Sequence, residues 1–208
     1  MEISYIGHSC FKIESKGRSI VLDPYADGSV PGLSPVREKA DAVFCSHGHG
    51  DHNAADLVEL TGSSPAPLSV TTFRSWHDDA QGSLRGGNLI TVVDDGESRL
   101  VHLGDLGHRL SDEQIEALGR ADCLLVPVGG YYTIDAELAA ETAERIGAAV
   151  TVPMHFRGEG FGYDVIGTVD AFLKHFENIE NKGASSYRLG AEEGRKVVLL
   201  SPGNKQNV

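Results

Sequence analysis

The chain has 208 residues, a length that fits one compact domain, so residues 1–208 are expected to form a single domain. Hydrophobic residues make up 40% and charged residues 23% of the composition, which is ordinary for a globular protein and disfavours disorder. The formal charge of -12 disfavours nucleic acid and anionic membranes as partners, because both would repel an acidic chain. The expected partner is a small-molecule substrate, and self-association into a homo-oligomer is left open.

The cysteines and the amino-terminal residues bear on the cellular compartment. Cys10, Cys45 and Cys123 are far apart and form no C-x-x-C pair, which disfavours a disulfide framework and a closed thiolate zinc site. Residues Met1 to Ser4 open without a basic region followed by an apolar run, and no stretch reaches the roughly 18 apolar residues that span a bilayer. We therefore expect a cytoplasmic protein.

Short apolar or alternating runs at the start of the chain are typical of strands. The segments Gly7-His8-Ser9 and Ser15-Lys16-Gly17 separate the first three runs and predict a meander. A fourth run leads directly into a histidine-rich segment, after which the composition is helical, with Asn53 as the expected N-cap. The predicted elements are strands at 2–6, 10–14, 18–22 and 42–45 and a helix at 54–60.

The second half of the chain first repeats the β pattern and then alternates helices with buried strands. Asp95-Gly96 marks a hairpin turn between two of the strands, and the tail after Pro202 is expected to fray. The predicted strands are 68–72, 89–93, 99–103, 123–128, 149–152 and 196–200, and the predicted helices are 112–118, 135–146 and one within 165–176. This order favours a mixed α/β (α+β) class with two sheets face to face and helices outside.

The segment His47-Gly48-His49-Gly50-Asp51-His52 predicts a metal site. It holds four potential ligands within six residues, and the two small glycines are expected to let the backbone turn so that these ligands converge. Imidazole and carboxylate donors suit zinc, iron or manganese, and the absence of a nearby cysteine argues against a purely structural thiolate site.

The segment Ser46 to His52 resembles the H-x-H-x-D-H signature of the metallo-β-lactamase superfamily. Further matches follow in the order typical of that superfamily, at Asp23, His77, Asp105 and His155, so the resemblance covers nearly the whole chain. It implies a four-layer αββα sandwich of the metallo-β-lactamase fold, with two metal ions at one edge.

The resemblance also implies a role for each matching position. His47, His49 and His77 would hold the first metal, Asp51, His52 and His155 would hold the second, and Asp105 would bridge them. Two divalent ions roughly 3.5–4 Å apart can share a water molecule and turn it into a hydroxide nucleophile. Zinc is the expected ion, with manganese and iron as alternatives, and Asp51 and Asp105 would serve the catalytic centre directly.

Other polar residues leave two interpretations open. Asp23 resembles an acidic residue that orients a ligand imidazole, although it could simply start a turn. His8 is a candidate catalytic residue or a plain turn histidine. Arg74, Arg85 and Arg157 lie close in sequence to proposed ligands and could bind an anionic group of the substrate, or could be solvated loop residues.

The remaining histidines and two tyrosines receive weaker predictions. His102 is expected in the core because it alternates with Leu100 on a strand, His108 at the rim or the surface, and His175 at the surface. Tyr131 and Tyr132 follow two glycines and either reach the cleft or pack within their loop.

The function expected from these residues is hydrolysis. The closest family resemblance is to the compact group that includes L-ascorbate-6-phosphate lactonase, which implies cleavage of an ester, lactone, amide or phosphodiester bond in a small metabolite. Zinc β-lactamases that resemble this fold usually place cysteine where Asp105 stands, which argues against antibiotic hydrolysis. The alternative is a metal-binding or sensing protein without turnover.

Overall fold

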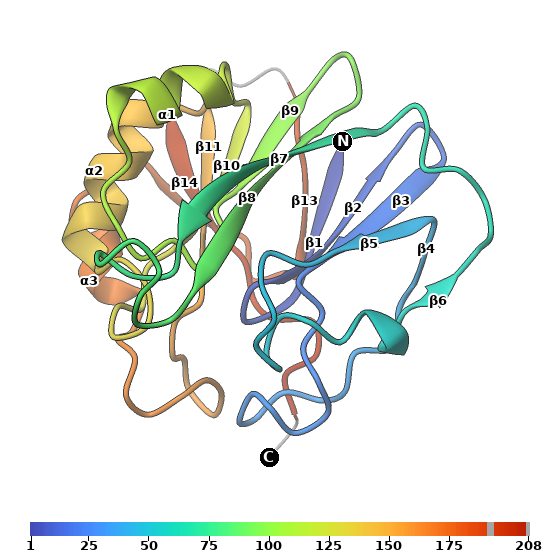
Figure 1. Cartoon of the computed structure of the whole chain (residues 1–208), viewed down its shortest axis with the longest axis horizontal. Helices are drawn as coiled ribbons and strands as arrows, with labels where there is room; N and C mark the ends of the chain where they lie inside the picture. The colour runs from blue at the N-terminus through green and yellow to red at the C-terminus, as the bar shows by residue number, and fades with distance from the viewer. Residues whose placement is uncertain (191–193, 207–208) are drawn as a thin grey trace.

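In the computed structural model, two large β-sheets lie face to face, and three helices run along the outer side of one of them (Figure 1). The structure describes residues 1–190 and 194–206. The predicted mixed α/β class and the two-sheet sandwich are confirmed. Within the described residues, no helix combines the length and the apolar character that a membrane span requires.

The first sheet has five strands in the order β13-β1-β2-β3-β5. Strands β1 to β3 form the predicted antiparallel meander, and β5 then adds to β3 in the parallel direction. The bounds are Glu2–Gly7 for β1, Cys10–Ser15 for β2, Arg18–Leu22 for β3, Ala42–Phe44 for β5 and Ser186–Arg188 for β13.

The second sheet has seven strands in the order β12-β14-β11-β10-β9-β8-β7. Strands β7, β8 and β9 form an antiparallel meander whose β8–β9 turn contains Asp95-Gly96 as predicted. From β9 through β10, β11 and β14 to β12, neighbouring strands are parallel. The bounds are Ser69–Trp76 for β7, Gly87–Asp94 for β8, Arg99–His102 for β9, Cys123–Pro127 for β10, Val150–Met154 for β11, Ile179–Asn181 for β12 and Lys196–Leu199 for β14.

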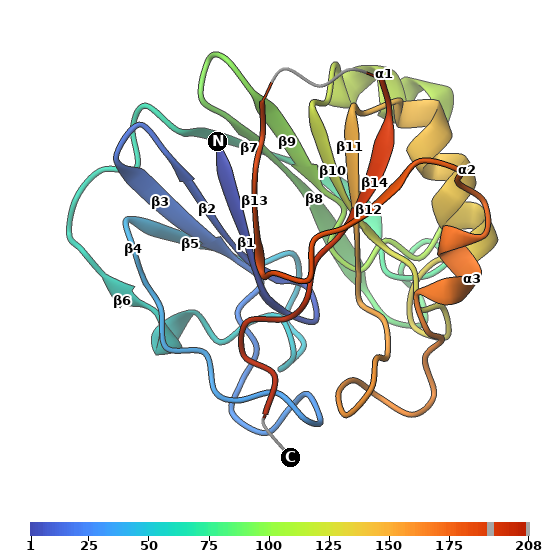
Figure 2. The same ribbon diagram turned by 180° about the vertical axis from the view of Figure 1, so that it is seen from behind.

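The helices α1 (Asp112–Leu118), α2 (Ala136–Ile146) and α3 (Asp170–Leu173) all lie beside the seven-stranded sheet (Figures 1 and 2). Side-chain caps fix the starts of α1 and α2, because Ser111 and Asp135 each accept a hydrogen bond from a backbone N–H of the first turn. On the far side, next to the five-stranded sheet, the described residues contribute the short 3-10 helix η1 (Ala55–Leu57) and a ladder of β4 (Lys39–Ala40) with β6 (Glu59–Leu60).

The hydrophobic core lies between the sheets and under the helices. Strands β10 and β11 are buried along their whole length, as expected for central parallel strands covered on both faces. One continuous cluster joins side chains of the first sheet, such as Ile13 and Ile20, with side chains of the second, such as Leu100 and Val152. The two sheets therefore hold each other in place mainly through apolar burial.

Strand direction brings the functional residues together. Strands β1, β3 and β5 run the same way in one sheet, as do β7, β9, β10 and β11 in the other, so their carboxyl ends meet at a common edge of each sheet. Six of these ends lead within one to three residues into a predicted site residue: β1 into His8, β3 into Asp23, β5 into His47, β7 into His77, β9 into Asp105 and β11 into His155.

The prediction of a helix at 54–60 is wrong. The chain makes only the single turn η1, and its cap residue is Ala54, not Asn53, with no side-chain hydrogen bond. The following residues pair instead with the 38–40 segment, since Glu59 N donates to Glu38 O and Thr61 N to Ala40 O. Tertiary pairing has overridden a weak local helical preference.

The carboxyl-terminal segment also differs from the prediction. Strands β12 and β13 lie between the last predicted helix and the last predicted strand, where no strand was predicted, and α3 occupies only four residues of the predicted helical window. The tail is not frayed over residues 203–206, because Gly203 N and Asn204 N donate to the carbonyls of Tyr5 and Ile6 on β1. Residues 207–208 lie outside the described residues.

Candidate metal centre

The parallel pairing of β3 with β5 builds the first part of the centre. Leu22 lies opposite Phe44 in the register, so the residues that follow these two strands are also neighbours. Asp23 N donates to Phe44 O at 2.9 Å, and Asp23 Oδ1 accepts a hydrogen bond from Ser46 N at 2.6 Å. Asp23 has a φ of 47° in the left-handed region, a conformation that its backbone contact to β5 maintains.

The Asp23 carboxylate orients two imidazoles. Its Oδ2 lies 2.8 Å from His52 Nδ1 and 2.6 Å from Ser46 Oγ, which in turn lies 2.9 Å from His47 Nδ1. Because an ionised carboxylate only accepts, His52 Nδ1–H and the Ser46 hydroxyl donate to Asp23, and His47 Nδ1–H donates to the hydroxyl oxygen. In the neutral form of each ring, Nε2 then carries no proton and is available as a ligand.

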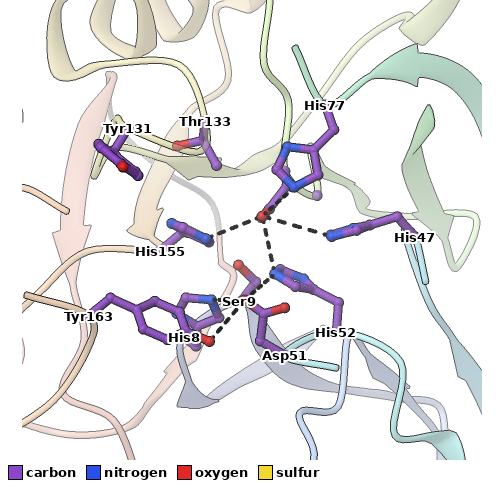
Figure 3. Close-up of polar contacts among 12 residues, drawn as sticks. His8, Ser9, His47, Asp51, His52, His77, Tyr131, Thr133, His155 and Tyr163 are labelled. Carbon is purple, nitrogen blue, oxygen red and sulfur yellow. Dashed lines mark hydrogen bonds and ion pairs between the residues drawn. The ribbon is translucent and has the colours of Figure 1, made fainter. Parts of the chain in front are cut away.

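The imidazoles of His47, His52, His77 and His155 point toward one another (Figure 3), and the carboxylate of Asp105 contacts all four. Its Oδ2 is 3.2 Å from His155 Nε2, 3.3 Å from His52 Nε2, 3.3 Å from His77 Nε2 and 4.0 Å from His47 Nε2. One carboxylate oxygen therefore faces imidazoles contributed by both sheets, which is the position that a bridging ligand requires.

Hydrogen bonds with Asn88 hold the loop that carries Asp105, which follows β9 of the second sheet. Asn88 Oδ1 accepts a hydrogen bond from Asp105 N at 2.9 Å, and Asn88 Nδ2 donates to Leu103 O at 2.9 Å. Asn88 is itself buried on β8. The sequence analysis did not identify Asn88, because an asparagine within a strand carries no signal for a contact with a loop 15 residues further on.

The predicted ligand positions converge into groups whose donor atoms lie within 4.8 Å of one another. The groups are His47-His49-His77, His8-Asp51-His52-His155 and His47-His52-Asp105. The first and second groups match the two predicted ligand sets, with His8 as an addition to the second, and the third joins them through Asp105.

The donor atoms fit a divalent metal ion better than they fit one another. Several of them are buried without a hydrogen-bond partner among the described residues, namely Nε2 of His8, His47, His52 and His155 and Oδ1 of Asp105. Unpaired buried polar atoms are costly, so native structures rarely contain a group of them without a further partner. Two donors about 2.1 Å from one tetrahedral zinc lie about 3.4 Å apart, close to the 3.2–3.3 Å contacts of Asp105 Oδ2.

The electrostatic environment keeps most of these groups in a form that binds metal. Burial, with a contribution from His155, lowers the pKa of His8 to about 4, and burial together with His52 lowers the pKa of His47 to about 4. Burial opposes ionisation of Asp105, but His155 and His52 hold its pKa well below the ordinary value. Neutral imidazoles facing an ionised carboxylate are the ligand forms that a divalent ion requires.

His52 differs from the other imidazoles because it lies between two carboxylates. Burial lowers its pKa, but Asp105 and Asp23 outweigh burial and raise that pKa well above the ordinary value. The charge environment therefore favours a positive charge at Nε2, which lies 3.3 Å from Asp105 Oδ2. A divalent ion between these two atoms would supply that charge.

His8 is not an isolated turn residue. It is fully buried, and its Nε2 lies 3.3 Å from Asp51 Oδ2. Its backbone has a φ of 57°, and its carbonyl accepts hydrogen bonds from Tyr5 Oη at 3.1 Å and from His155 N at 3.0 Å. These contacts maintain an unfavourable backbone conformation that turns the ring toward the second group of donors.

The expected role of Gly48 and Gly50 is wrong. Neither residue has its φ in the left-handed region, and an added Cβ at either position would meet nothing within 4 Å. The histidine segment therefore reaches its conformation without a special requirement for glycine. Both glycines are exposed, one on each side of His49 in the sequence.

A cavity of about 380 Å³ opens over the donor groups. Its lining residues are His49, Asp51, His77, Leu84, Arg85, Asp105, Tyr132 and Tyr163. Tyr132 thus reaches the cleft, whereas the neighbouring Tyr131 is exposed. Tyr163 was not predicted; its hydroxyl donates to Ser29 O at 2.7 Å and lies 3.3 Å from Asp51 Oδ2, contacts for which its glycine-flanked segment gives no signal.

The structure brings one of the three candidate arginines to this cavity. Arg85 lines it, but Arg74 lines a separate hollow beside α1. Arg157 is half-buried, and its Nε donates to Ile166 O at 3.3 Å. Closeness in sequence to His77 or His155 did not bring Arg74 or Arg157 to the cavity, because each side chain is directed by its own strand or loop.

The other histidines lie outside the donor groups. His102 is buried as predicted, donating from Nε2 to Ser9 O and accepting from Gly104 N at Nδ1. His108 is half-buried and lines a hollow with Trp76. His175 is exposed on the surface, as predicted.

We expect Asp23→Asn to weaken metal affinity by about 10–100-fold while the fold is kept. An amide has one acceptor oxygen, so its NH₂ group must face either the Ser46 N–H or the His52 Nδ1–H, both of which are donors. Competition with a chromogenic chelator measures the affinity, and circular dichroism checks the fold. An unchanged affinity would return Asp23 to the role of a turn residue.

We expect Ser46→Ala to act on one donor group more than on the other. The variant keeps the contact of Asp23 with His52 but removes the hydroxyl that links Asp23 to His47. The ion expected in the His47-His49-His77 group should therefore be lost at a lower chelator concentration than the ion expected in the second group. Parallel loss of both ions would show that Ser46 does not orient His47.

Comparison with known proteins places this geometry in a family. Residues 2–155, which include all the donor residues, match the description of a β-lactamase superfamily domain. A UPF0173 metal-dependent hydrolase of Bacillus cereus is 31% identical over 195 residues, with 75% of this chain and 86% of that protein covered.

A solved structure from Thermotoga maritima extends the likeness to the fold. That protein, proposed to be a Zn-dependent hydrolase of the metallo-β-lactamase superfamily, is 33% identical, with 96% of this chain and 97% of that chain covered and a TM-score of 0.79. A UPF0173 metal-dependent hydrolase of Thermoplasma acidophilum is 27% identical over 188 residues. The chain therefore belongs to the metallo-β-lactamase superfamily and, within it, to the UPF0173 metal-dependent hydrolases.

Proposed function

We propose that this chain hydrolyses an ester, lactone, amide or phosphodiester bond in a small metabolite, using two divalent metal ions. The observation that supports this proposal is the convergence of two donor groups on one oxygen of Asp105 beneath an open cavity. A closed structural site would have no need of the cavity. The names of the relatives as metal-dependent hydrolases agree with this function.

The proposed ligands divide between the two sheets. His47, His49 and His77 would hold one ion, and Asp51, His52 and His155 the other, with Asp105 between them and His8 beside Asp51. Two ions in such a site activate a water molecule for attack and stabilise negative charge that develops on the substrate. Zinc is the proposed ion, since imidazole and carboxylate donors suit it, and manganese or iron would accept the same donors.

The protein residues around the cavity would bind and orient the substrate. Tyr132 and Tyr163 contribute aromatic rings to the lining, and Asp51 and Asp105 contribute carboxylates. Such a cavity suits a small molecule. The resemblance to L-ascorbate-6-phosphate lactonase and the cytoplasmic location remain predictions.

The experiment that tests this function starts from protein stripped of metal with a chelator. Zinc, manganese or iron is added back, and a panel of chromogenic esters, lactones, amides and phosphodiesters is assayed. We expect turnover of at least one class, appearing only after metal is restored. If the reloaded protein holds two ions per chain and cleaves none of the panel, the hydrolase proposal fails and the non-catalytic metal-binding alternative is favoured.

A further inference from the structure

The cavity over the donor groups has one wall made of residues outside those groups, called here the second wall. It is formed by the 78–86 loop, which contributes Leu84 and Arg85, and by Tyr132 from the loop after β10. His77 N donates to Gly86 O at 3.1 Å, so the end of this loop is tied to the backbone of a proposed ligand. The second wall therefore has a fixed position relative to the metal centre.

The carboxylate of Asp78 holds the 78–86 loop in one conformation. Asp78 Oδ1 accepts hydrogen bonds from Ala80 N and Gly82 N, both at 2.9 Å, and Oδ2 accepts from Leu84 N at 3.1 Å and Arg85 N at 2.7 Å. Asp78 is almost fully buried although it lies in a loop. Four charge-assisted hydrogen bonds from one side chain are an unusually strong constraint on a surface loop, and one of them fixes the backbone of Arg85 itself.

The guanidinium of Arg85 is held in the cavity by neutral groups. Nη2 donates to Tyr131 O at 3.1 Å, and the guanidinium carbon lies 5.9 Å from the centre of the Tyr132 ring. Arginine has five N–H donors, so most of them are left for another partner. Within residues 1–190 and 194–206 Arg85 forms no ion pair, in contrast to Arg37 and Arg145, which pair with carboxylates.

The cavity lining carries charges of both signs. Among the described residues that line the cavity, Arg85 is the one arginine or lysine, and it shares the cavity with the carboxylates of Asp51 and Asp105. Both carboxylates lie in the donor groups, and Arg85 does not. Among the described residues this half-buried cation has no counter-ion, and in a chain with a net charge of -12 that leaves an anionic group of the ligand as the natural partner.

We propose that Arg85 binds a carboxylate or phosphate group of the substrate, at a position remote from the bond that is cleaved. The planar guanidinium can form two parallel hydrogen bonds with such an oxyanion, and the contacts with Tyr131 and Tyr132 orient it before the substrate arrives. This inference rests on the proposed hydrolase function. The substrate class is then a small metabolite that carries an anionic group at the end away from its reacting bond.

Three chromogenic esters that differ only at the remote end test the proposal. They are 4-nitrophenyl pentanoate with a methyl terminus, mono-4-nitrophenyl glutarate with a carboxylate, and 4-nitrophenyl 4-phosphonobutanoate with a phosphonate. The zinc-loaded protein should prefer one or both of the anionic esters, and the preferred ester distinguishes a carboxylate ligand from a phosphate-like one.

Arg85→Ala should raise KM for the preferred anionic ester about tenfold or more and leave KM for the pentanoate ester within twofold, because the lost hydrogen bonds are charge-assisted and remote from the reaction. Arg85→Lys should recover part of the loss, since it restores the charge but not the two-pronged geometry. Arg74→Ala is the matched control, because Arg74 lies in a different hollow, and it should change neither constant.

A binding measurement separates this inference from the proposed function. Glutarate is titrated calorimetrically into the zinc-loaded protein and into Arg85→Ala. If none of the three esters is cleaved but glutarate binding weakens tenfold in the variant, the hydrolase proposal loses support and the anion site stands. If Arg85→Ala affects charged and neutral esters equally, or leaves glutarate binding unchanged, Arg85 is a structural residue of the loop and the anion site is refuted.

Discussion

Replacing Asp105 with alanine is expected to abolish most of the proposed hydrolytic activity and to release at least one of the two proposed ions. Asp105 Oδ2 lies 3.2–3.3 Å from the imidazoles of His77, in one donor group, and of His52 and His155, in the other. The substitution removes the shared oxygen and leaves these imidazoles without their common anionic partner in a buried site. Metal content measured by plasma emission on the purified variant gives the number of ions per chain.

A control variant makes this result specific. Asp56→Ala removes a carboxylate that is exposed on η1, just beyond the histidine segment, and it should keep both ions and full activity. Circular dichroism of both variants should match that of the unmodified protein. If Asp105→Ala retains two ions per chain, Asp105 does not bridge the two sites.

Gly107→Ala is expected to destabilise the protein by about 1–3 kcal/mol and to weaken the binding of the ion proposed at His77. Gly107 N donates to Trp76 O at 2.9 Å, and an added Cβ would lie 2.3 Å from the carbonyl carbon of His77 and 2.4 Å from Asp78 N. These are backbone atoms, so no side-chain rotation relieves the clash. The loop that carries Asp105 and the end of β7 would have to separate, which moves two proposed ligands apart.

Gly87→Ala is the matched control for this effect. Gly87 lies opposite Trp76 in the sheet, close to the same ligand, yet a Cβ there would meet nothing within 4 Å and its φ is outside the left-handed region. Its stability should stay within about 0.5 kcal/mol of the unmodified protein. Thermal and urea denaturation of both variants measures the difference, and equal effects would show that the close approach at Gly107 is not what matters.

The two ligand sets were predicted from the resemblance to the metallo-β-lactamase superfamily, and the structure brings their residues together because each follows a strand or lies in the histidine segment. The sequence could not decide the role of His8, whose contact with the backbone of His155 depends on how the two sheets dock. It could not separate Arg85 from Arg74 either, since both lie within eight residues of His77. Only the winding of the 78–86 loop around Asp78 directs Arg85 into the cavity.

Errors in the predicted elements have a similar origin. The residues after Asn53 have helical composition, but their backbone groups bond to the 38–40 segment, a partner that no local pattern reveals. The tail after Pro202 reads as polar and irregular, yet Asn204 donates from its side chain to Tyr25 Oη and Pro35 O. Local composition indicates only the intrinsic preference for helix, strand or loop. The conformation of these segments is set instead by contacts across more than a hundred residues or between neighbouring loops.

The assembly of the centre from strand ends of both sheets couples metal binding to folding. His8 and Asp51 follow strands of one sheet and His155 follows a strand of the other, so an ion held by this donor group would be held only by the docked pair of sheets. By thermodynamic linkage, such an ion stabilises the folded chain by about 2.7 kcal/mol when its free concentration is 100 times its dissociation constant. The marginal stability of the sandwich then becomes a function of the metal supply of its surroundings, and metal starvation would loosen the same interface that the apolar core holds together.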